Sequence, residues 1–373
     1  MYFQTNYGDH MPKLVSRGFL AGALFMTCFC ANTAVNASNT ATISESHKRA
    51  LPEKFTNTHI NYKTSLSDMW KVTKAYFSDN RETAAPTFNI PVAQLSTASL
   101  DAINEDSIVK LGHSTTLLKM DGKYVLIDPV FSERASPVQW MGPKRFHATP
   151  ISIEALPKLS VVIISHDHYD HLDKASVEML ESKTEQFIVP LKVGNHLRDW
   201  GIAQDKITEL DWWQSTVQGG IEITATPSQH FSGRGLFDRD ETLWASWVIR
   251  SVSTNVFYSG DSGYFDGFKE IGERFGPFDL SLIETGAYNE LWSDIHMLPH
   301  QSLKAHIDVN AKVMMPVHNS TFDLALHDWN EPLNKITALA NENNVPICVP
   351  IFGEILPIKQ AAAAPNKRWW VEG

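Results

Sequence analysis

The sequence contains little cysteine, with three residues of this type among 373. Cys28 and Cys30 both lie in an apolar N-terminal stretch, and if this stretch is removed the chain keeps only Cys348. A chain with a single cysteine cannot form an intramolecular disulfide. We therefore expect a large core or bound metal to stabilise the fold.

Positive charge is also scarce. The 32 Lys and Arg residues are outnumbered by 42 Asp and Glu residues, which gives a formal net charge of -10 at pH 7. Such an acidic chain is not expected to bind nucleic acid, because it repels a polyanion. The same charge excludes strong electrostatic attachment to anionic bilayers, so a peripheral membrane contact would depend on apolar insertion.

Long hydrophobic runs are missing as well. The uncharged run at residues 18–30 is short for a membrane span. It follows Lys13 and Arg17 and precedes the small-residue sequence Val-Asn-Ala at 35–37, which is the layout of a secretory signal. We expect residues 1–37 to be a signal peptide, which could begin at Met11. The alternative is that this segment is retained as a membrane anchor. The expected location is the periplasm or the exterior, free or membrane-associated.

Residues 38–100 are predicted to form a leader and an amphipathic helical segment. Up to about residue 65 the leader is polar, without apolar periodicity, and predicts a poorly ordered stretch that carries no chemistry. The sequence SLSDMWKVTKAYF at 65–77 places apolar residues at mostly helical spacing. Packing on the domain and contact with lipid are equally consistent with this helix.

Short apolar runs then recur across residues 101–360, before a C-terminal tail at 361–373. Residues 108–120 and 123–128 predict a hairpin around Asp121-Gly122. Further strands are expected at 161–165, 187–190, 207–210, 221–226, 243–249, 255–259, 280–284 and 313–317. Helical patterns lie near 174–182, 265–274, 300–308 and 330–342. Strands interleaved with helices over this length predict one α/β domain built as a layered sandwich.

The sequence VVIISHDHYDHLD places a run of His and Asp directly after a buried strand. Imidazole and carboxylate groups are good zinc ligands, and strand alternation lets His166 and His168 face one metal while the turn brings Asp170 and His171 to a second. Burying so many polar groups without partners would be costly. The pattern therefore predicts a metal site.

Three isolated residues follow later β runs: His230 after 221–226, Asp261 after 255–259 and His318 after 313–317. Taken singly, each could be an ordinary turn residue. Residues at strand ends converge on one edge of an α/β sheet, however, and together with the first motif these three would complete two coordination spheres.

The order HxHxDH, His, Asp, His resembles the metallo-β-lactamase superfamily. The segments RASPVQWMGPKRF, ELDWW and TPSQHFSGR are more narrowly similar to the N-acylphosphatidylethanolamine-hydrolysing phospholipase D family, over residues 108–354. This resemblance implies a four-layer αββα sandwich with two zinc ions. It also implies the release of N-acylethanolamine and phosphatidic acid from a membrane lipid.

The resemblance implies roles for individual residues. One zinc would be bound by His166, His168 and His230, and the other by Asp170, His171 and His318. Asp261 would bridge the two ions beside a bridging water. His296 falls where the family keeps a histidine near the substrate phosphate. His113 and Asp128 would orient ligands, and Arg234 also has a counterpart.

Two neighbouring cations lower the pKa of a shared water, so hydroxide is the expected nucleophile. We therefore expect Asp170, Asp261 and His296 to be catalytic, with His296 donating a hydrogen bond to the charged phosphoryl oxygens. Iron or manganese could replace zinc. The alternatives are a hydrolase of the same fold that acts on a lactone, cyclic nucleotide or β-lactam, and a protein that retains the fold without chemistry.

Overall fold

The computed structural model describes residues 51–60, 62, 65–78, 81–364 and 367–371. The predicted signal peptide at 1–37, with Cys28 and Cys30, lies outside the described residues. Cys348 is a fully buried free thiol whose pKa burial raises to about 12. In the part of the chain that is described, no helix is long and apolar enough to cross a membrane.

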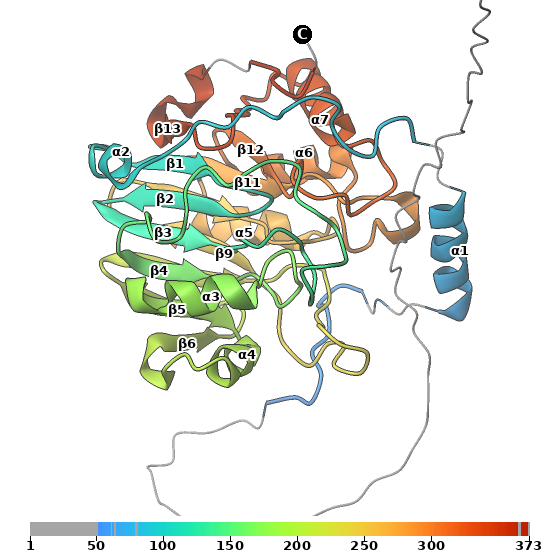
Figure 1. Cartoon of the computed structure of the whole chain (residues 1–373), viewed down its shortest axis with the longest axis horizontal. Helices are drawn as coiled ribbons and strands as arrows, with labels where there is room; N and C mark the ends of the chain where they lie inside the picture. Colours follow the sequence, from blue (N-terminus) through green and yellow to red (C-terminus); the bar gives the residue numbers. More distant parts are fainter. Residues whose placement is uncertain (1–50, 61, 63–64, 79–80, 365–366, 372–373) are drawn as a thin grey trace, which may run out of the picture.

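The first of two sheets has seven strands in the order β13-β1-β2-β3-β4-β5-β6 (Figure 1). Strands β1, β2 and β3 are antiparallel neighbours, and β3 to β6 run parallel. The bounds are β1 Ser107–Lys110, β2 Thr116–Met120, β3 Lys123–Ile127, β4 Leu159–Ile163, β5 Thr184–Pro190, β6 Ile207–Leu210 and β13 Ile355–Pro357.

The second sheet has six strands in the order β12-β11-β10-β9-β8-β7. Strands β7 to β10 are antiparallel neighbours, whereas β10, β11 and β12 run parallel. The bounds are β7 Ser215–Gln218, β8 Ile221–Thr226, β9 Ser246–Arg250, β10 Asn255–Tyr258, β11 Leu280–Glu284 and β12 Met314–Val317.

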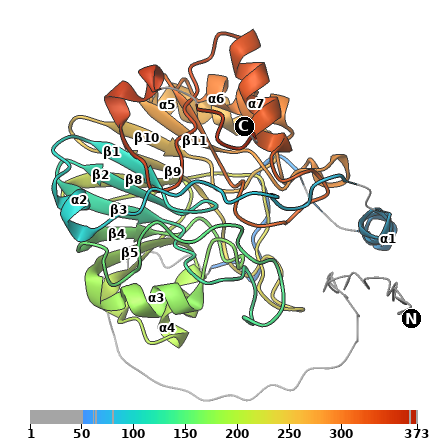
Figure 2. The ribbon, with the colours of Figure 1, turned by 45° about the horizontal axis from the view of Figure 1, so that its top comes forward.

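Helices cover the outer face of each sheet, which confirms the predicted αββα sandwich. Figure 2 shows α3 and α4 on one side of the two sheets and α5, α6 and α7 on the other. The bounds are α1 Leu66–Phe77, α2 Thr97–Asp101, α3 Lys174–Leu180, α4 Val193–Asp199, α5 Gly267–Phe275, α6 Pro299–Asp308 and α7 Glu331–Glu342.

Each sheet contributes to two hydrophobic cores, because successive strand residues point to opposite faces. In β4, Val161 and Ile163 pack between the sheets, while Val162 packs under the helices on the outer face. All three side chains are fully buried. Covering both faces explains why the parallel strands are nearly continuous apolar runs.

The predicted strand at 108–120 is wrong as a single element. The chain reverses between β1 and β2, which pair antiparallel from Lys110 and Thr116 onwards. The backbone N–H groups of Leu111 and Gly112 both donate to the carbonyl of Thr115, at 2.9 and 3.1 Å. The turn is polar in sequence, Gly-His-Ser-Thr at 112–115, and its side chains are buried in the fold. The predicted hairpin at Asp121-Gly122 is confirmed between β2 and β3.

The prediction of a poorly ordered leader is wrong for residues 51–60, which lie against the domain. The backbone N–H of Phe55 donates to the carbonyl of Asp240 at 2.8 Å. The ring of Phe55 is buried with Leu243 and Trp244. Burial of one aromatic ring fixes the segment, and composition alone does not reveal such a contact.

The two ends of the described chain differ in how they pack. The predicted helix at 65–77 is confirmed as α1, where Tyr76 stacks on Trp292 with the ring centroids 6.4 Å apart. Trp70 and Phe77 on the same helix are 70% and 89% exposed. In the predicted C-terminal tail, by contrast, Trp370 is fully buried and belongs to the core beside α7.

Candidate metal centre

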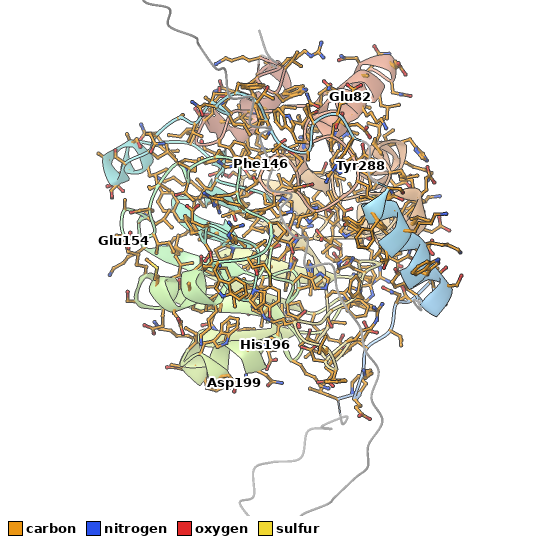
Figure 3. All side chains as sticks on the ribbon, turned by 45° about the vertical axis from the view of Figure 1, so that its right-hand side comes forward. Glu82, Phe146, Glu154, His196, Asp199 and Tyr288 are labelled. Carbon is orange, nitrogen blue, oxygen red and sulfur yellow. The ribbon has the colours of Figure 1, made fainter. Side chains whose placement is uncertain are left out.

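The polar residues predicted to form a site lie at one edge of the sandwich. They follow the carboxyl ends of β1, β3 and β4 in one sheet and of β8, β10 and β12 in the other. In Figure 1 the strands β1 and β3 point to the right, towards this edge. Figure 3 turns this side forward, where Phe146 and Tyr288 are labelled. The parallel directions of these strands bring the loops together, as the sequence predicted.

The first group consists of His166, His168 and His230, whose ligand atoms lie within 4.8 Å of one another. Nδ1 of His168 lies 2.8 Å from Nε2 of His166 and 3.3 Å from Nε2 of His230. Two imidazole nitrogens bound to one tetrahedral zinc would be separated by about 3.3 Å, given Zn–N bonds of ~2.0–2.1 Å. The three nitrogens are therefore arranged as ligands of one cation.

The second group consists of Asp170, His171 and His318, together with His113. Oδ2 of Asp170 lies 3.2 Å from Nε2 of His318, 3.3 Å from Nε2 of His113 and 3.5 Å from Nε2 of His171. The sequence predicted the first three as ligands and gave His113 an orienting role. The structure places His113 within ligand distance as well.

Asp261 lies between the two groups. Its carboxylate oxygens lie 3.2 Å from Nε2 of His171 and 3.0 Å from Nε2 of His318 in the second group. They lie 3.8 Å from Nε2 of His166 and 3.9 Å from Nε2 of His230 in the first group. One carboxylate thus faces imidazoles from both groups, which is the arrangement expected of a bridging ligand.

Two glycines allow the strand ends to approach closely enough for this arrangement. Gly260, directly before Asp261, has φ +57°, and a Cβ there would lie 2.7 Å from the carbonyl oxygen of Ala245. A Cβ at Gly286 would lie only 2.0 Å from the carbonyl oxygen of His318. Any larger residue would therefore push Asp261 or His318 out of place.

Several of the nitrogen and oxygen atoms that could bind a metal are buried without a hydrogen bond. Among the described residues, Nε2 of His171 and Oδ1 of Asp261 form no hydrogen bond of suitable geometry, although the two atoms lie 3.2 Å apart. Unsatisfied polar atoms are rare in protein interiors, and those that occur together need an explanation such as an ion. Together with the donor chemistry, they fit a pair of divalent cations. Nitrogen and carboxylate donors suit zinc and also iron or manganese.

The two groups differ in charge when no metal is bound. At Asp170 of the second group and at Asp261 between the groups, burial would raise the pKa of the carboxyl group. The neighbouring histidines outweigh burial and hold both pKa values well below the usual range. Burial also lowers the pKa of His318, but Asp261 and Asp170 outweigh it and raise that pKa to about 10. In the first group, burial lowers the pKa of His166 and His230 well below 6.5, so both are neutral.

Asp128 fixes the orientation of His171. Its carboxylate accepts hydrogen bonds from Nδ1 of His171 at 2.6 Å, from the hydroxyl of Ser165 at 2.6 Å and from the hydroxyl of Tyr258 at 2.5 Å. Holding Nδ1 in this way leaves Nε2 of His171 facing Asp170 and Asp261. The orienting role that the sequence suggested for Asp128 therefore has a structural basis. Ser165 and Tyr258 were not predicted.

Glu284 is a second buried carboxylate that the sequence analysis missed. It ends β11, is fully buried, and accepts hydrogen bonds from Nδ1 of His296 and the backbone N–H of Met297, both at 3.0 Å. Burial raises its pKa, and His296 opposes that effect. A ring nitrogen of His296 lies within 4.8 Å of ligand atoms of His230 and Asp261. A Glu at the end of the predicted strand LSLIE was the available signal.

Asp167 and Arg234 support the motif from outside the two groups. Asp167 accepts hydrogen bonds from the backbone N–H of Gly233 and the hydroxyl of Thr242, both at 2.8 Å. Nη1 of Arg234 donates to the carbonyls of Asp167 at 2.6 Å and Leu172 at 2.7 Å. Arg234 thus holds both ends of the HDHYDHL segment to the loop that follows His230.

Comparison with known sequences gives three results of different weight. A family model described as the beta-lactamase superfamily domain matches residues 123–319, a range that includes all seven predicted ligands. A protein of Mycobacterium tuberculosis without an assigned function is 44% identical over 273 residues, which cover 72% of this chain and 73% of that protein. A Caenorhabditis elegans protein named N-acyl-phosphatidylethanolamine-hydrolyzing phospholipase D 1 is 36% identical over 242 residues, 61% of this chain and 68% of its own.

Among solved structures, an isothiocyanate hydrolase from gut bacteria of Delia radicum resembles this chain with a TM-score of 0.54. The match covers 67% of this chain and 98% of the other, at 22% sequence identity. At this identity the similarity concerns the fold alone.

Metal binding at this centre should release protons. The raised pKa values of His171 and His318 mean that both are protonated at pH 7 without metal, and a cation needs their neutral form. Affinity should therefore rise with pH until His318 titrates near pH 10. Calorimetry at pH 7 in buffers of different ionisation enthalpy should show release of about two protons per chain. A binding enthalpy that does not depend on the buffer would contradict this charge assignment.

Proposed function

The chain belongs to the metallo-β-lactamase superfamily and is a hydrolase of that fold, and from this premise we propose that it is a phosphodiesterase of phospholipase D type. The proposed substrate is N-acylphosphatidylethanolamine or a related glycerophospholipid, cleaved to N-acylethanolamine and phosphatidic acid. The observation that carries this proposal is the 36% identity to the C. elegans protein of that name. The clustered His and Asp residues support it.

The proposed cofactor is a pair of zinc ions. His166, His168 and His230 would hold one ion, Asp170, His171 and His318 the other, and Asp261 both. Such a pair supplies Lewis acidity to phosphoryl oxygens and lowers the pKa of water near neutral pH. The unpartnered donor atoms and the short nitrogen–nitrogen distances support this assignment.

His296 is the protein group proposed to contact the substrate phosphate. Glu284 accepts a hydrogen bond from Nδ1 of His296 and so fixes the direction of the ring. When both ring nitrogens carry a proton, the imidazolium can also donate from Nε2 to oxygens that gain charge in the transition state. The surrounding core excludes water from Glu284, which strengthens its hold on His296.

A membrane surface is the proposed partner. Large apolar side chains are exposed in segments that border the site: α1 contacts Trp292 near His296, and two loops follow Asp128 and His230. These side chains are Trp70 and Phe77 on α1, Trp140 in the 131–146 loop, Leu236 and Phe237 in the 231–242 loop, and Leu291. Apolar insertion by such residues is consistent with the net charge of -10, which gives no electrostatic attraction to anionic lipid.

Lipid hydrolysis should depend on Asp170. We expect mass spectrometry to detect N-acylethanolamine and phosphatidic acid after the metal-loaded protein is incubated with N-acylphosphatidylethanolamine. Asp170→Asn should reduce this activity by at least about 100-fold, because even residues that only orient metal ligands contribute ~10–100-fold. Asp199→Asn makes the same chemical change at an exposed position of α4 and serves as the control. Circular dichroism should show the same fold in all three proteins.

Full activity of Asp170→Asn would refute the proposed metal site. A wild-type protein that leaves the lipid intact but hydrolyses a lactone, a cyclic nucleotide or a β-lactam would instead refute the proposed substrate.

Binding to vesicles should depend on the exposed face of α1. Removing an inserted apolar side chain costs ~1.5–3 kcal/mol, so Trp70→Ala with Phe77→Ala should weaken binding to phosphatidylcholine vesicles by at least about tenfold. The matched control is Val252→Ala, which removes a 97% exposed side chain between β9 and β10, at the opposite edge. Sedimentation with vesicles measures the difference. Equal binding by both variants would exclude α1 as the contact.

A further inference from the structure

The N-terminal segment of residues 51–60 crosses the loop that carries His230. Nζ of Lys192 donates to the carbonyls of Pro52 at 2.6 Å and Glu53 at 3.0 Å, and Phe55 pairs with the backbone of Asp240. These contacts attach the segment on the N-terminal side of Asn57. On the C-terminal side, the ring of His59 packs against the ring of Phe265, with the centroids 5.2 Å apart. The segment is therefore held in place independently of its contact with His230.

Asn57 binds both backbone groups of His230. The backbone N–H of His230 donates to Oδ1 of Asn57 at 3.0 Å, and Nδ2 of Asn57 donates to the carbonyl of His230 at 2.8 Å. Nε1 of Trp244 also donates to Oδ1 of Asn57, at 3.1 Å. The planar amide acts here like one residue of a neighbouring strand, because it offers a donor and an acceptor side by side.

His230 has no neighbouring strand of its own, since β8 ends at Thr226. Within the described part of the chain, its backbone N–H and carbonyl have no other partner than Asn57. The residue is fully buried, and an unpaired backbone group in such a place destabilises the fold. Asn57 therefore stabilises the position of the His230 backbone.

The ring of His230 is held separately. Its Nδ1 contacts the carbonyl of Ile295 at 2.9 Å, which leaves Nε2 facing Nδ1 of His168. Ile295 thus sets the rotation of the ring, while Asn57 sets the place from which the ring projects. A shift of the backbone by a fraction of an ångström would move Nε2 away from the other two nitrogens.

We propose that Asn57 is a positioning residue for His230, and that the N-terminal segment is consequently a part of the metal centre. This inference rests on the proposed role of His230 as a metal ligand. Asn57 would act on the ion of the first group and leave the ion of the second group unaffected, because its bonds reach only His230 and Trp244.

The test is metal retention under a graded chelator, measured as metal per chain with zinc as the probe. Asn57→Leu has a similar volume but makes neither bond to His230. We expect it to lose one of two ions at a chelator concentration about 10–100-fold lower than the wild type. Excess zinc should restore the lost ion of the first group. Asn57→Asp keeps the acceptor and loses the donor, so it should show a smaller loss and remain measurable if the Leu variant does not fold.

The control is Lys54→Ala, which removes a bond from the same segment to the carbonyl of Arg239 and does not touch His230. It should retain both ions like the wild type. A purely structural role would be revealed by unchanged retention in the Asn57 variants, with unfolding temperatures lowered equally with and without zinc, and would overturn the inference. A wild type that holds fewer than two ions would overturn the metal site itself. A wild type that holds two ions but cleaves no lipid would overturn only the substrate.

Discussion

Seven histidine and aspartate side chains lie together at one edge of the sandwich, five of them buried and His168 and Asp170 partly exposed. The need to compensate this burial constrains the structure around them. An isolated buried charge is prohibitive, and a buried polar atom without a partner costs several kcal/mol. Asp261 relieves this constraint in part, because its carboxylate faces imidazoles of both groups. The donor atoms that still lack hydrogen bonds are then available to cations.

The residues outside the ligand groups fit the same constraint. Asp128 and Glu284 are fully buried carboxylates, and each holds a histidine by its Nδ1 atom. Asn57 and Ile295 do the equivalent for His230 with neutral groups. Each of these contacts restricts the movement of a histidine ring or of its backbone, and leaves Nε2 of that histidine available to a ligand. The proposed chemistry at the edge thus depends on a shell of orienting hydrogen bonds drawn from both sheets and from the N-terminal segment.

The seven candidate ligands could be recognised in the sequence because each of them leaves a local signal. A polar run directly after the buried strand β4, and single His or Asp residues at the ends of β8, β10 and β12, can be recognised without knowing the fold. The hydrogen bonds that orient the ligands leave no such signal. Asn57 lies 173 residues from His230, and Tyr258 lies 130 residues from Asp128, so only the folded chain brings them together. The reversal between β1 and β2 was missed although Gly-His-Ser-Thr at 112–115 is polar, because the apolar residues on either side were joined into one strand.

The central claim, that this edge holds two metal ions, is tested most directly by anomalous diffraction from crystals of the protein grown with zinc. We expect two peaks at the zinc edge, one among His166, His168 and His230, the other among Asp170, His171 and His318, with Asp261 between them. A single peak, or peaks at other residues, would contradict the claim.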